Sequence, residues 1–299
     1  MKKILILAGG KIKHLEPFLE AGKNVGAEVV VGSFGELSYL TESSQKTPRL
    51  FVGERDIADF DVIYFRLVGK RAEDAALVVS FAREHKIPVV DQIYTRDGFI
   101  NLPLKKGQEA VCLVQAGISF PKTFFGGLDM ILEKAPEIFD FPFVVKGSYG
   151  KQGHAVWRVD NKDQLRKLVG ELKKLEREGK RFFAQEFIKI TERTRVFVLG
   201  DRLLGSITMP TKWRRYVQGI YGGRETPERS PLTERELALA VGAAQALGID
   251  VAGVDLIQDL ETRKVYVLEV NSAPRWARFK KETGINVEEE IVKYLAGLS

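Results

Sequence analysis

The sequence contains few of the residues that build disulfides, transition-metal sites and membrane spans. A single cysteine among 299 residues excludes an internal disulfide and fits a reducing compartment. The three histidines are too widely spaced to indicate a zinc site, so any bound metal should be a hard ion held by oxygen ligands. No apolar run approaches the roughly 20 residues of a membrane span. These absences predict a cytoplasmic protein without a membrane partner.

Charged residues are abundant, but the two signs are mixed. Lysine and arginine number 46 against 40 acidic residues, which gives a net charge of +6. A diffuse excess of this size is weak support for nucleic-acid binding, and we predict no nucleic-acid partner. The hydrophobic fraction of 44% and the chain length suit two or three modest domains with substantial cores.

The first third of the chain alternates apolar strands with helical patterns. The expected strands are residues 4–8, 27–32, 61–66 and 87–90, and the expected helices are residues 15–26 and 72–85. This alternation predicts an α/β domain with a mostly parallel sheet over residues 1–95. Gly9-Gly10 is not followed by the rest of a G-x-G-x-x-G motif, which argues against a dinucleotide site.

The remainder of the chain predicts two further domains, residues 96–188 and 189–299. The former should begin with a helix and then contain a strand, a glycine-rich loop and a second strand. The latter is rich in strands and is interrupted by a helix that begins with the capping box Thr233-Glu-Arg-Glu236. The predicted fold class is therefore α/β and α+β.

The glycine-rich loop is the segment Lys146-Gly-Ser-Tyr-Gly-Lys-Gln-Gly153, between two β-branched strands. A strand–loop–strand is not a Walker P-loop, which needs Gly-Lys-Ser/Thr at the start of a helix. The three glycines and Ser148 let backbone amides close on an anion. Lys146 ends an apolar strand, where a charge is costly without an anionic partner. The segment predicts a phosphate-binding loop, and an ordinary glycine-rich hairpin remains the alternative.

Two apolar strands near the C-terminal end flank a turn centred on Thr262. With this centre Asp255 lies opposite Glu269, and Asn271 shares their face because side chains alternate along a strand. Two facing carboxylates repel each other unless a cation lies between them. Since Asp, Glu and Asn are oxygen ligands of the kind that hold magnesium, the hairpin predicts a Mg²⁺ site. The alternative is that one carboxylate faces solvent.

Together these segments resemble the ATP-grasp superfamily, and within it the RimK-like branch of ribosomal-protein glutamate ligases and related amino-acid ligases. The likeness runs from about residue 96 to the end of the sequence. It rests on the order and spacing of Val-Val-Lys-Gly-Ser-Tyr-Gly-Lys-Gln-Gly, Gln-Glu-Phe-Ile-Lys (185–189), Arg-Val-Phe-Val-Leu-Gly-Asp (195–201), Ala-Gly-Val-Asp (252–255) and Glu-Val-Asn-Ser-Ala-Pro (269–274). The resemblance implies an ATP-grasp fold with an N-terminal parallel-sheet (pre-ATP-grasp) domain.

The resemblance also implies roles for individual residues. Arg195 matches an arginine near the transferred phosphate and is the predicted catalytic residue. Mg²⁺, or Mn²⁺ in its place, is implied at Asp255, Glu269 and Asn271. ATP contacts are implied for the two lysines, the loop and the hinge between domains: Lys106, Lys146, Gly147, Ser148, Tyr149, Gly150, Gly153, Gln185, Glu186, Phe187, Ile188 and Lys189.

The implied activity is that of an ATP-dependent carboxylate–amine ligase. A carboxylate substrate would attack the γ-phosphorus of ATP, and an amine, such as an amino acid, would then attack the acyl phosphate. Closure of residues 147–153 would exclude water from this reactive species. Two alternatives remain, an ATP-grasp small-molecule kinase and a catalytically silent ATP-binding regulatory protein. The complete metal set argues against the silent protein.

The chain departs from the family pattern on the acceptor side. Arg193 stands where relatives often have an acidic residue, and Arg275-Trp276 stands where they usually have small residues. Residues 210–224 and 275–281 are basic and contain no acidic residue. They predict an acidic substrate, such as a glutamate-like compound or a peptide or protein tail, held by bidentate arginine contacts, with an ordinary basic surface as the alternative. The candidate substrate residues are Arg66, Arg214, Arg215, Arg224 and Arg275. A homo-oligomer is left open.

Overall fold

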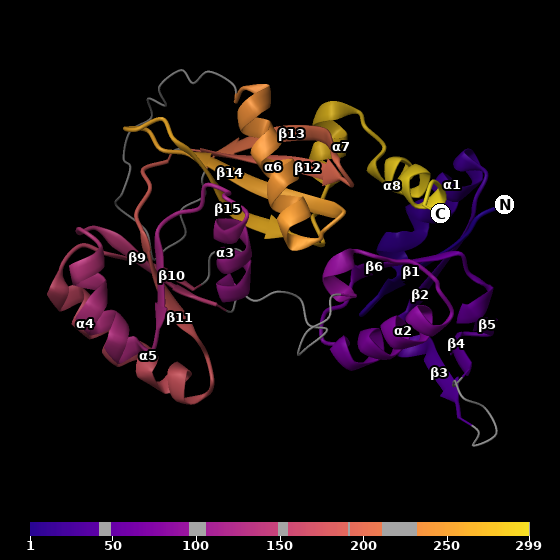
Figure 1. Ribbon diagram of the computed structural model, residues 1–299, viewed down its shortest axis with the longest axis horizontal. Helices are drawn as coiled ribbons and strands as arrows, with labels where there is room; N and C mark the ends of the chain where they lie inside the picture. Colours follow the sequence, from indigo (N-terminus) through magenta and orange to yellow (C-terminus); the bar gives the residue numbers. More distant parts are fainter. Residues whose placement is uncertain (42–48, 96–105, 149–154, 191, 211–231, 299) are drawn as a thin grey trace.

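The computed structural model describes residues 1–41, 49–95, 106–148, 155–190, 192–210 and 232–298 (Figure 1). Within these ranges, three four-stranded sheets follow one another along the chain, and a smaller three-stranded sheet accompanies the first. Among the described helices, none combines the length and the apolar character that crossing a membrane requires.

The N-terminal sheet has the strand order β2-β1-β6-β7, and its paired strands are parallel. Its strands are β1 (Lys3–Ala8), β2 (Glu28–Ser33), β6 (Val62–Leu67) and β7 (Val89–Val90), with helices α1 (Glu16–Val25) and α2 (Ala72–Glu84). The predicted α/β domain with a parallel sheet is therefore confirmed. Helix α1 ends at Gly26, whose φ of 76° lies in the left-handed region that glycine adopts without strain.

A small antiparallel sheet in the same part of the chain was not predicted from the sequence. It consists of β3 (Leu37–Leu40), β4 (Arg49–Val52) and β5 (Arg55–Asp56). Short 3₁₀ turns connect the elements of this region: η1 (Lys13–Leu15), η2 (Phe34–Glu36), η3 (Ile57–Asp59) and η4 (Gln92–Tyr94). Strands of two to four residues give too short an alternation to be recognised in a sequence.

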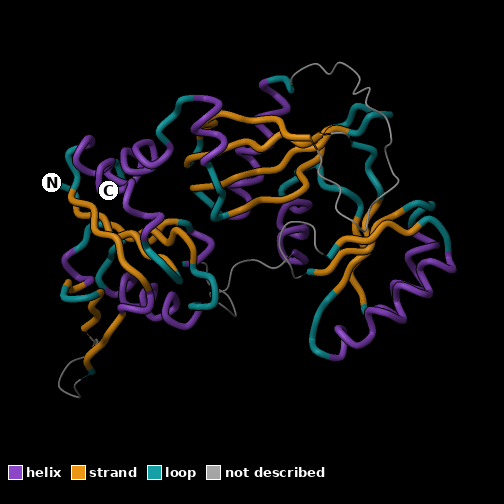
Figure 2. The backbone as a smooth tube through the Cα atoms, turned by 180° about the vertical axis from the view of Figure 1, so that it is seen from behind, coloured by secondary structure: helices purple, strands orange, loops and turns teal. Residues whose placement is uncertain are grey.

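The central sheet has the order β10-β9-β11-β8, and its paired strands are antiparallel. Its elements are β8 (Thr123–Gly126), α4 (Leu128–Ile138), β9 (Phe143–Gly147), β10 (Val156–Val159), α5 (Lys162–Arg177) and β11 (Phe182–Glu186). Helices α4 and α5 cover the face turned away from the C-terminal sheet (Figure 2). Helix α4, which contains Pro136, was not predicted from the sequence. The strands β9 and β10 flank the glycine-rich loop as expected.

The C-terminal sheet is antiparallel with the order β13-β12-β14-β15. Its strands are β12 (Glu192–Leu199), β13 (Arg202–Pro210), β14 (Val251–Gln258) and β15 (Val265–Asn271), with helices α6 (Glu234–Leu247), α7 (Ala277–Thr283) and α8 (Val287–Ala296). The predicted capping box at Thr233 and Glu236 is present. Helix α3 (Lys106–Gln115) precedes the central sheet in the chain, yet it lies beside α6 and β15 (Figure 1).

The N-terminal and C-terminal parts share their hydrophobic cores. One core joins Leu5 and Phe65 to Val196 and Val254, and a second joins Ile4 to helix α8. At the seam Asp91 is fully buried, and its Oδ1 accepts the backbone N–H groups of Asp250 and Val251. Burial raises the pKa of Asp91 well above its ordinary value. These contacts fix the C-terminal sheet on the N-terminal domain.

Candidate active site

The β14–β15 hairpin places Asp255 opposite Glu269, which confirms the predicted register. The turn itself is centred between Glu261 and Thr262, because Gln258 pairs with Val265. An irregularity between Asp255 and Leu256 shifts the register by one residue and restores the expected pair. The correct pairing therefore depends on a bulge that the sequence analysis did not include.

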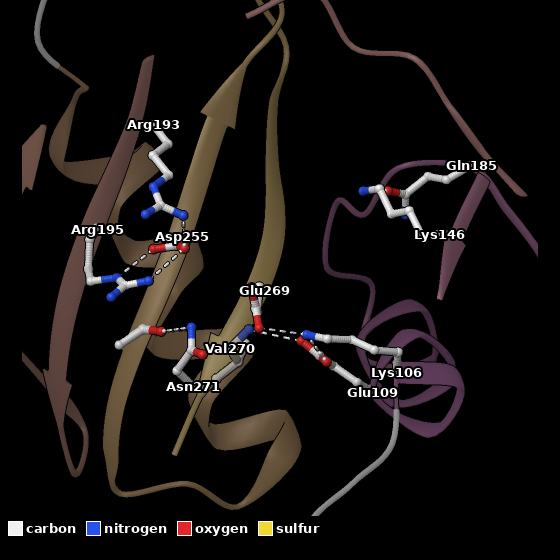
Figure 3. A network of polar contacts seen from close by, with 11 residues as sticks. Lys106, Glu109, Lys146, Gln185, Arg193, Arg195, Asp255, Glu269, Val270 and Asn271 are labelled. Atoms are coloured by element: carbon white, nitrogen blue, oxygen red, sulfur yellow. Dashed lines mark hydrogen bonds and ion pairs between the residues drawn. The ribbon is translucent and has the colours of Figure 1, made fainter. Parts of the chain in front are cut away.

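Asp255 is fully buried, and both of its carboxylate oxygens accept hydrogen bonds from arginines on β12 (Figure 3). Arg195 donates from Nε to Oδ1 at 2.7 Å and from Nη2 to Oδ2 at 2.8 Å. Arg193 donates from Nη1 to Oδ2 at 3.0 Å. A buried carboxylate needs such compensation, since its charge is otherwise strongly disfavoured. The cations that neutralise Asp255 in this structure are two guanidinium groups.

Glu269 is paired with Lys106 at 2.9 Å, and Lys106 also contacts Glu109 at 3.0 Å. Burial by itself raises the pKa of Glu269, but Lys106, together with the charges of Arg195 and Lys146, more than offsets this and holds the pKa below its ordinary value. Lys106 thus lies directly beside a predicted metal ligand.

Glu109 is a site residue that the sequence analysis missed. It is only 4% exposed, and its Oε1 accepts the backbone N–H of Val270 at 2.8 Å. Val270 separates the predicted ligands Glu269 and Asn271, so Glu109 ties helix α3 to the hairpin at the site. An acidic residue three positions after Lys106 in an apolar helix was the available signal.

Lys146 reaches the site from the central sheet. Its Nζ donates to Gln185 Oε1 at 2.5 Å, and Gln185 Nε2 donates to Thr123 Oγ1 at 2.7 Å. Burial, and then the charge of Lys106, lowers the pKa of Lys146 to about 8. The positive charges of the two lysines therefore repel each other across the boundary between the central and C-terminal sheets (Figure 3). A polyanion between them would stabilise both charges.

The described start of the glycine-rich loop is already hydrogen-bonded. The backbone N–H of Gly147 donates to the Ala155 carbonyl, and that of Ser148 donates to the Arg181 carbonyl, both at 2.8 Å. These two amides extend the central sheet and do not point free N–H groups at an anion here. Tyr149, Gly150 and Gly153 lie outside the described residues.

The predicted hinge begins within β11, which contains Gln185 and Glu186, and continues beyond the end of this strand. The Oε1 of Glu186 accepts the Lys122 backbone N–H at 2.6 Å, and its own N–H donates to the Lys122 carbonyl. The ring of Phe187 lies 5.0 Å from the Arg158 guanidinium. Ile188 joins a small apolar cluster with Ile190, Ile257, Tyr266 and Leu268. Lys189 forms an ion pair with Glu261, so the hinge contacts the turn of the metal hairpin.

The candidate substrate residues have different environments. Arg66 is 8% exposed, donates to the Pro274 carbonyl at 2.6 Å and lies 4.0 Å from the Trp276 ring centroid. It is buried at the seam with the C-terminal part and does not belong to an exposed basic surface. Arg275 is exposed. Arg214, Arg215 and Arg224 lie outside the described residues.

The basic segment 275–281 is partly neutralised by acidic residues that follow shortly after it in the chain. Arg278 pairs with Glu282 and Lys280 pairs with Glu288, both at 2.5 Å. The segment therefore carries less uncompensated charge than its sequence indicates. Arg275 is exposed, and among the described residues no acidic side chain forms an ion pair with it.

Asp255, Glu269 and Asn271 fit a hard divalent cation by their chemistry. The Nδ2 of Asn271 donates to the Gly253 carbonyl at 3.3 Å, which leaves the amide oxygen available as a ligand. In the described part of the chain no cluster of three or more His, Cys, Asp and Glu residues suits a metal. The site thus depends on Asn271 as its third protein ligand.

The arrangement of two sheets, with a lysine from each side and a carboxylate hairpin, defines an ATP-grasp enzyme. The model of the RimK-like ATP-grasp domain matches residues 105–295, and the chain belongs to this family. It is an ATP-dependent carboxylate–amine ligase that forms ADP, and the kinase and regulatory alternatives are not favoured. ATP and Mg²⁺ are the general requirements of this class.

Similar proteins support this assignment. A probable alpha-L-glutamate ligase of Mannheimia succiniciproducens is 28% identical over 260 residues, which cover 85% of this chain and 80% of that protein. A probable alpha-L-glutamate ligase of Pasteurella multocida is 24% identical over 307 residues, covering 99% and 94%.

Solved structures show the same fold at low sequence identity. The ATP-grasp ligase PsnB complexed with a minimal precursor has a TM-score of 0.71 at 17% identity, covering 98% of each chain. A RimK domain ATP-grasp protein from Sphaerobacter thermophilus has a TM-score of 0.67 at 20% identity, covering 99% of this chain and 100% of that one. Another PsnB structure is complexed with minimal precursor, Mg and ADP, and has a TM-score of 0.69 at 15% identity, covering 98% and 96%.

Proposed function

We propose that this ligase activates an acidic carboxylate substrate as an acyl phosphate and joins it to the amine of an amino acid or peptide. The observation that carries the proposal is the Lys106–Glu269 ion pair at 2.9 Å, with Lys146 of β9 near enough for its charge to act on both groups. The charges of two cations from different parts of the fold thus act on one carboxylate. This is the charge distribution that a bound polyphosphate requires.

The roles of the residues follow from their positions. Lys106 and Lys146 bind the phosphates of ATP, and Arg195 stabilises the charge of the transferred phosphoryl group. Asp255, Glu269 and Asn271 would hold Mg²⁺, with Mn²⁺ as a substitute. The bound metal would neutralise charge that spreads over the phosphoryl oxygens.

The reaction has two steps that balance without a side-chain nucleophile. A substrate carboxylate oxygen attacks the γ-phosphorus, the bond to the β-phosphate oxygen breaks, and ADP leaves. The amine nitrogen then attacks the acyl carbon and loses a proton, and inorganic phosphate leaves.

The need for ATP and the lone cysteine support a cytoplasmic location.

An acidic substrate is supported by the exposed Arg275, next to the segment that ends the metal hairpin. Matched relatives are named probable alpha-L-glutamate ligases, and one solved neighbour is complexed with a precursor peptide. We therefore include glutamate-like compounds and acidic peptides among the candidate substrates.

The test is an ADP-release screen over pairs of acidic carboxylates and amino acids, with Glu269→Ala as the blank. We expect ADP formation that requires both substrates and is absent in the blank. ADP formed without any amine, together with a phosphorylated product, would contradict the ligase.

Substrate recognition is tested with a matched pair of arginine variants. Arg275→Ala should raise the KM for the acidic substrate about tenfold, the effect of one lost charged hydrogen bond. Arg278→Ala is the control, because Arg278 is already paired with Glu282. Equal KM values in both variants would refute the role of Arg275.

A further inference from the structure

Arg193 makes a contact with Asp255 that the proposed roles above do not use. It lies two residues before Arg195 on β12, so both side chains project from the same face of the strand. Its Nη1 lies 3.0 Å from Asp255 Oδ2, an oxygen that Arg195 also contacts. Two guanidinium groups thus converge on a single buried carboxylate (Figure 3).

The two arginines are not equivalent. The Arg195 side chain is 17% exposed and binds both carboxylate oxygens, whereas the Arg193 side chain is 38% exposed and makes one hydrogen bond. A bidentate pair is the stronger and more rigid arrangement. Because one guanidinium suffices to balance one carboxylate, Arg193 supplies an excess positive charge at Asp255. It is also the group that can turn toward solvent at lower cost.

This excess charge opposes a divalent cation at the same carboxylate. Asp255 has about four lone-pair positions, and three are occupied by the hydrogen bonds from the two arginines. A metal bound to Asp255 would lie close to both guanidinium groups, and like charges at such distances repel strongly in a partly buried site. Stable occupancy therefore requires that Arg193 move or that negative charge arrive nearby.

We propose that Arg193 is a built-in counterion of Asp255 that makes metal binding at this carboxylate depend on the nucleotide, an inference that rests on the proposed function. Without nucleotide, Arg193 holds Oδ2 and weakens metal binding. Nucleotide phosphates offer Arg193 another anionic partner and release Oδ2. By thermodynamic linkage, nucleotide and metal each raise the affinity of the other by the same factor.

The test measures Mn²⁺ binding to the full chain without nucleotide, by the electron paramagnetic resonance signal of free Mn²⁺. Arg193→Gln should bind Mn²⁺ about tenfold more tightly than the wild type, as expected for removal of one nearby positive charge. Arg202→Gln is the matched control, since Arg202 on β13 pairs with Glu290 and is 52% exposed. Its Mn²⁺ affinity should stay within about twofold of the wild type.

Several outcomes would overturn the inference. An unchanged Mn²⁺ affinity in Arg193→Gln, or an equal gain in Arg202→Gln, would show that Arg193 does not compete with the metal. Arg193→Lys keeps the charge and should behave like the wild type, so a gain equal to that of Arg193→Gln would also contradict it. Arg193→Ala provides a second neutral variant if the glutamine variant does not fold.

A second titration includes ADP and corrects for the Mn²⁺–ADP complex by a protein-free blank. ADP should raise Mn²⁺ affinity in the wild type and should raise it less in Arg193→Gln. If no variant binds Mn²⁺ even with ADP, the metal part of the proposed function fails together with the inference. If the wild type and all variants bind Mn²⁺ with ADP, and ADP raises their Mn²⁺ affinities by the same factor, only the inference fails.

Discussion

The central sheet and the rest of the molecule bury their apolar residues in different ways. The core of the central part, which includes Phe143, Leu168 and Phe182, contains only residues of that part. The N-terminal and C-terminal parts instead share two cores that cross their boundary. The molecule is therefore built as a continuous platform plus a central domain with a core of its own.

This difference has a direct consequence for ATP binding. Lys106 and the metal hairpin belong to the platform, whereas Lys146 belongs to the central domain. The described apolar link between them is the small cluster around Ile188 and Tyr266. A change in the angle between the two bodies would alter the distance between the lysines, while the hairpin would keep its geometry. Four predictions test this division.

The largest effects are expected from a matched pair of core variants. Phe143 lies in the central core and Phe279 in the shared core against Phe197, and both are completely buried. Each Phe→Ala change should cost about 3–5 kcal/mol. Hydrogen exchange should show loss of protection in the central domain alone for Phe143→Ala, and in the platform for Phe279→Ala. Equal loss throughout the chain in both variants would refute two separate bodies.

The seam of the platform is tested by Arg66→Met. This change removes a charged hydrogen bond to the Pro274 carbonyl and the cation–π contact with Trp276. We expect the free energy of unfolding to fall by about 2–4 kcal/mol in urea titrations. Arg71→Met is the control, because Arg71 makes only an exposed pair with Asp74. Similar losses in both variants would mean that Arg66 does not stabilise the seam.

The meeting of the two bodies at the nucleotide site is tested through the pH dependence of ATP binding. Lys146 has a pKa of about 8 without nucleotide, through burial and the Lys106 charge. Phosphates favour its charged form and raise this pKa, so binding is strongest below pH 8. Affinity should fall above pH 8 by up to about tenfold per pH unit until the pKa of the bound state is reached.

Lys146→Gln provides the check on this prediction. Titrations with a fluorescent ATP analogue between pH 7 and 9.5, roughly one to two units around the Lys146 pKa, should show a weaker and flatter profile for the variant. A variant that keeps the slope of the wild type would assign the titration to another group.

The smallest effect is expected at the hinge. Glu261→Gln removes the ion pair between Glu261 and Lys189. This pair is exposed, since the side chains of Glu261 and Lys189 are 65% and 48% exposed. Because exposed pairs contribute little, the free energy of unfolding should change by less than about 1 kcal/mol. A loss of unfolding free energy as large as that of Arg66→Met would show that the hinge ion pair stabilises the fold as much as the seam contacts do.

The sequence predicted those features whose signal is local. The parallel N-terminal sheet followed from the alternation of strands and helices, whereas the Asp255–Glu269 pair followed from an assumed turn centre whose one-residue error the bulge offsets. The short strands β3 to β5 and the proline-containing helix α4 were missed because their local patterns are brief or interrupted. The bulge in the hairpin was missed because β14 is buried along its whole length, so it has no apolar–polar alternation that an extra residue could interrupt.

The sequence analysis also overstated the charge of one segment and missed a contact between distant residues. Residues 275–281 read as uniformly basic, yet Glu282 and Glu288 neutralise two of their cations. The contact of Glu109 with the Val270 backbone joins residues 161 positions apart. The Arg278–Glu282 pair is an i,i+4 pair within α7 that the sequence can predict, whereas the Glu109 contact requires knowing which elements pack together.

By itself, the sequence determined the chemistry available to this protein: its candidate phosphate-binding lysines, its candidate oxygen ligands and the helix or strand that presents each one. Only the tertiary structure decided how those groups are paired. It placed α3 on the C-terminal part, buried Arg66 in a seam and directed Arg193 and Arg195 onto Asp255. The reason is physical: side-chain direction follows from local backbone geometry, whereas the balance of buried charge depends on neighbours that only folding brings together.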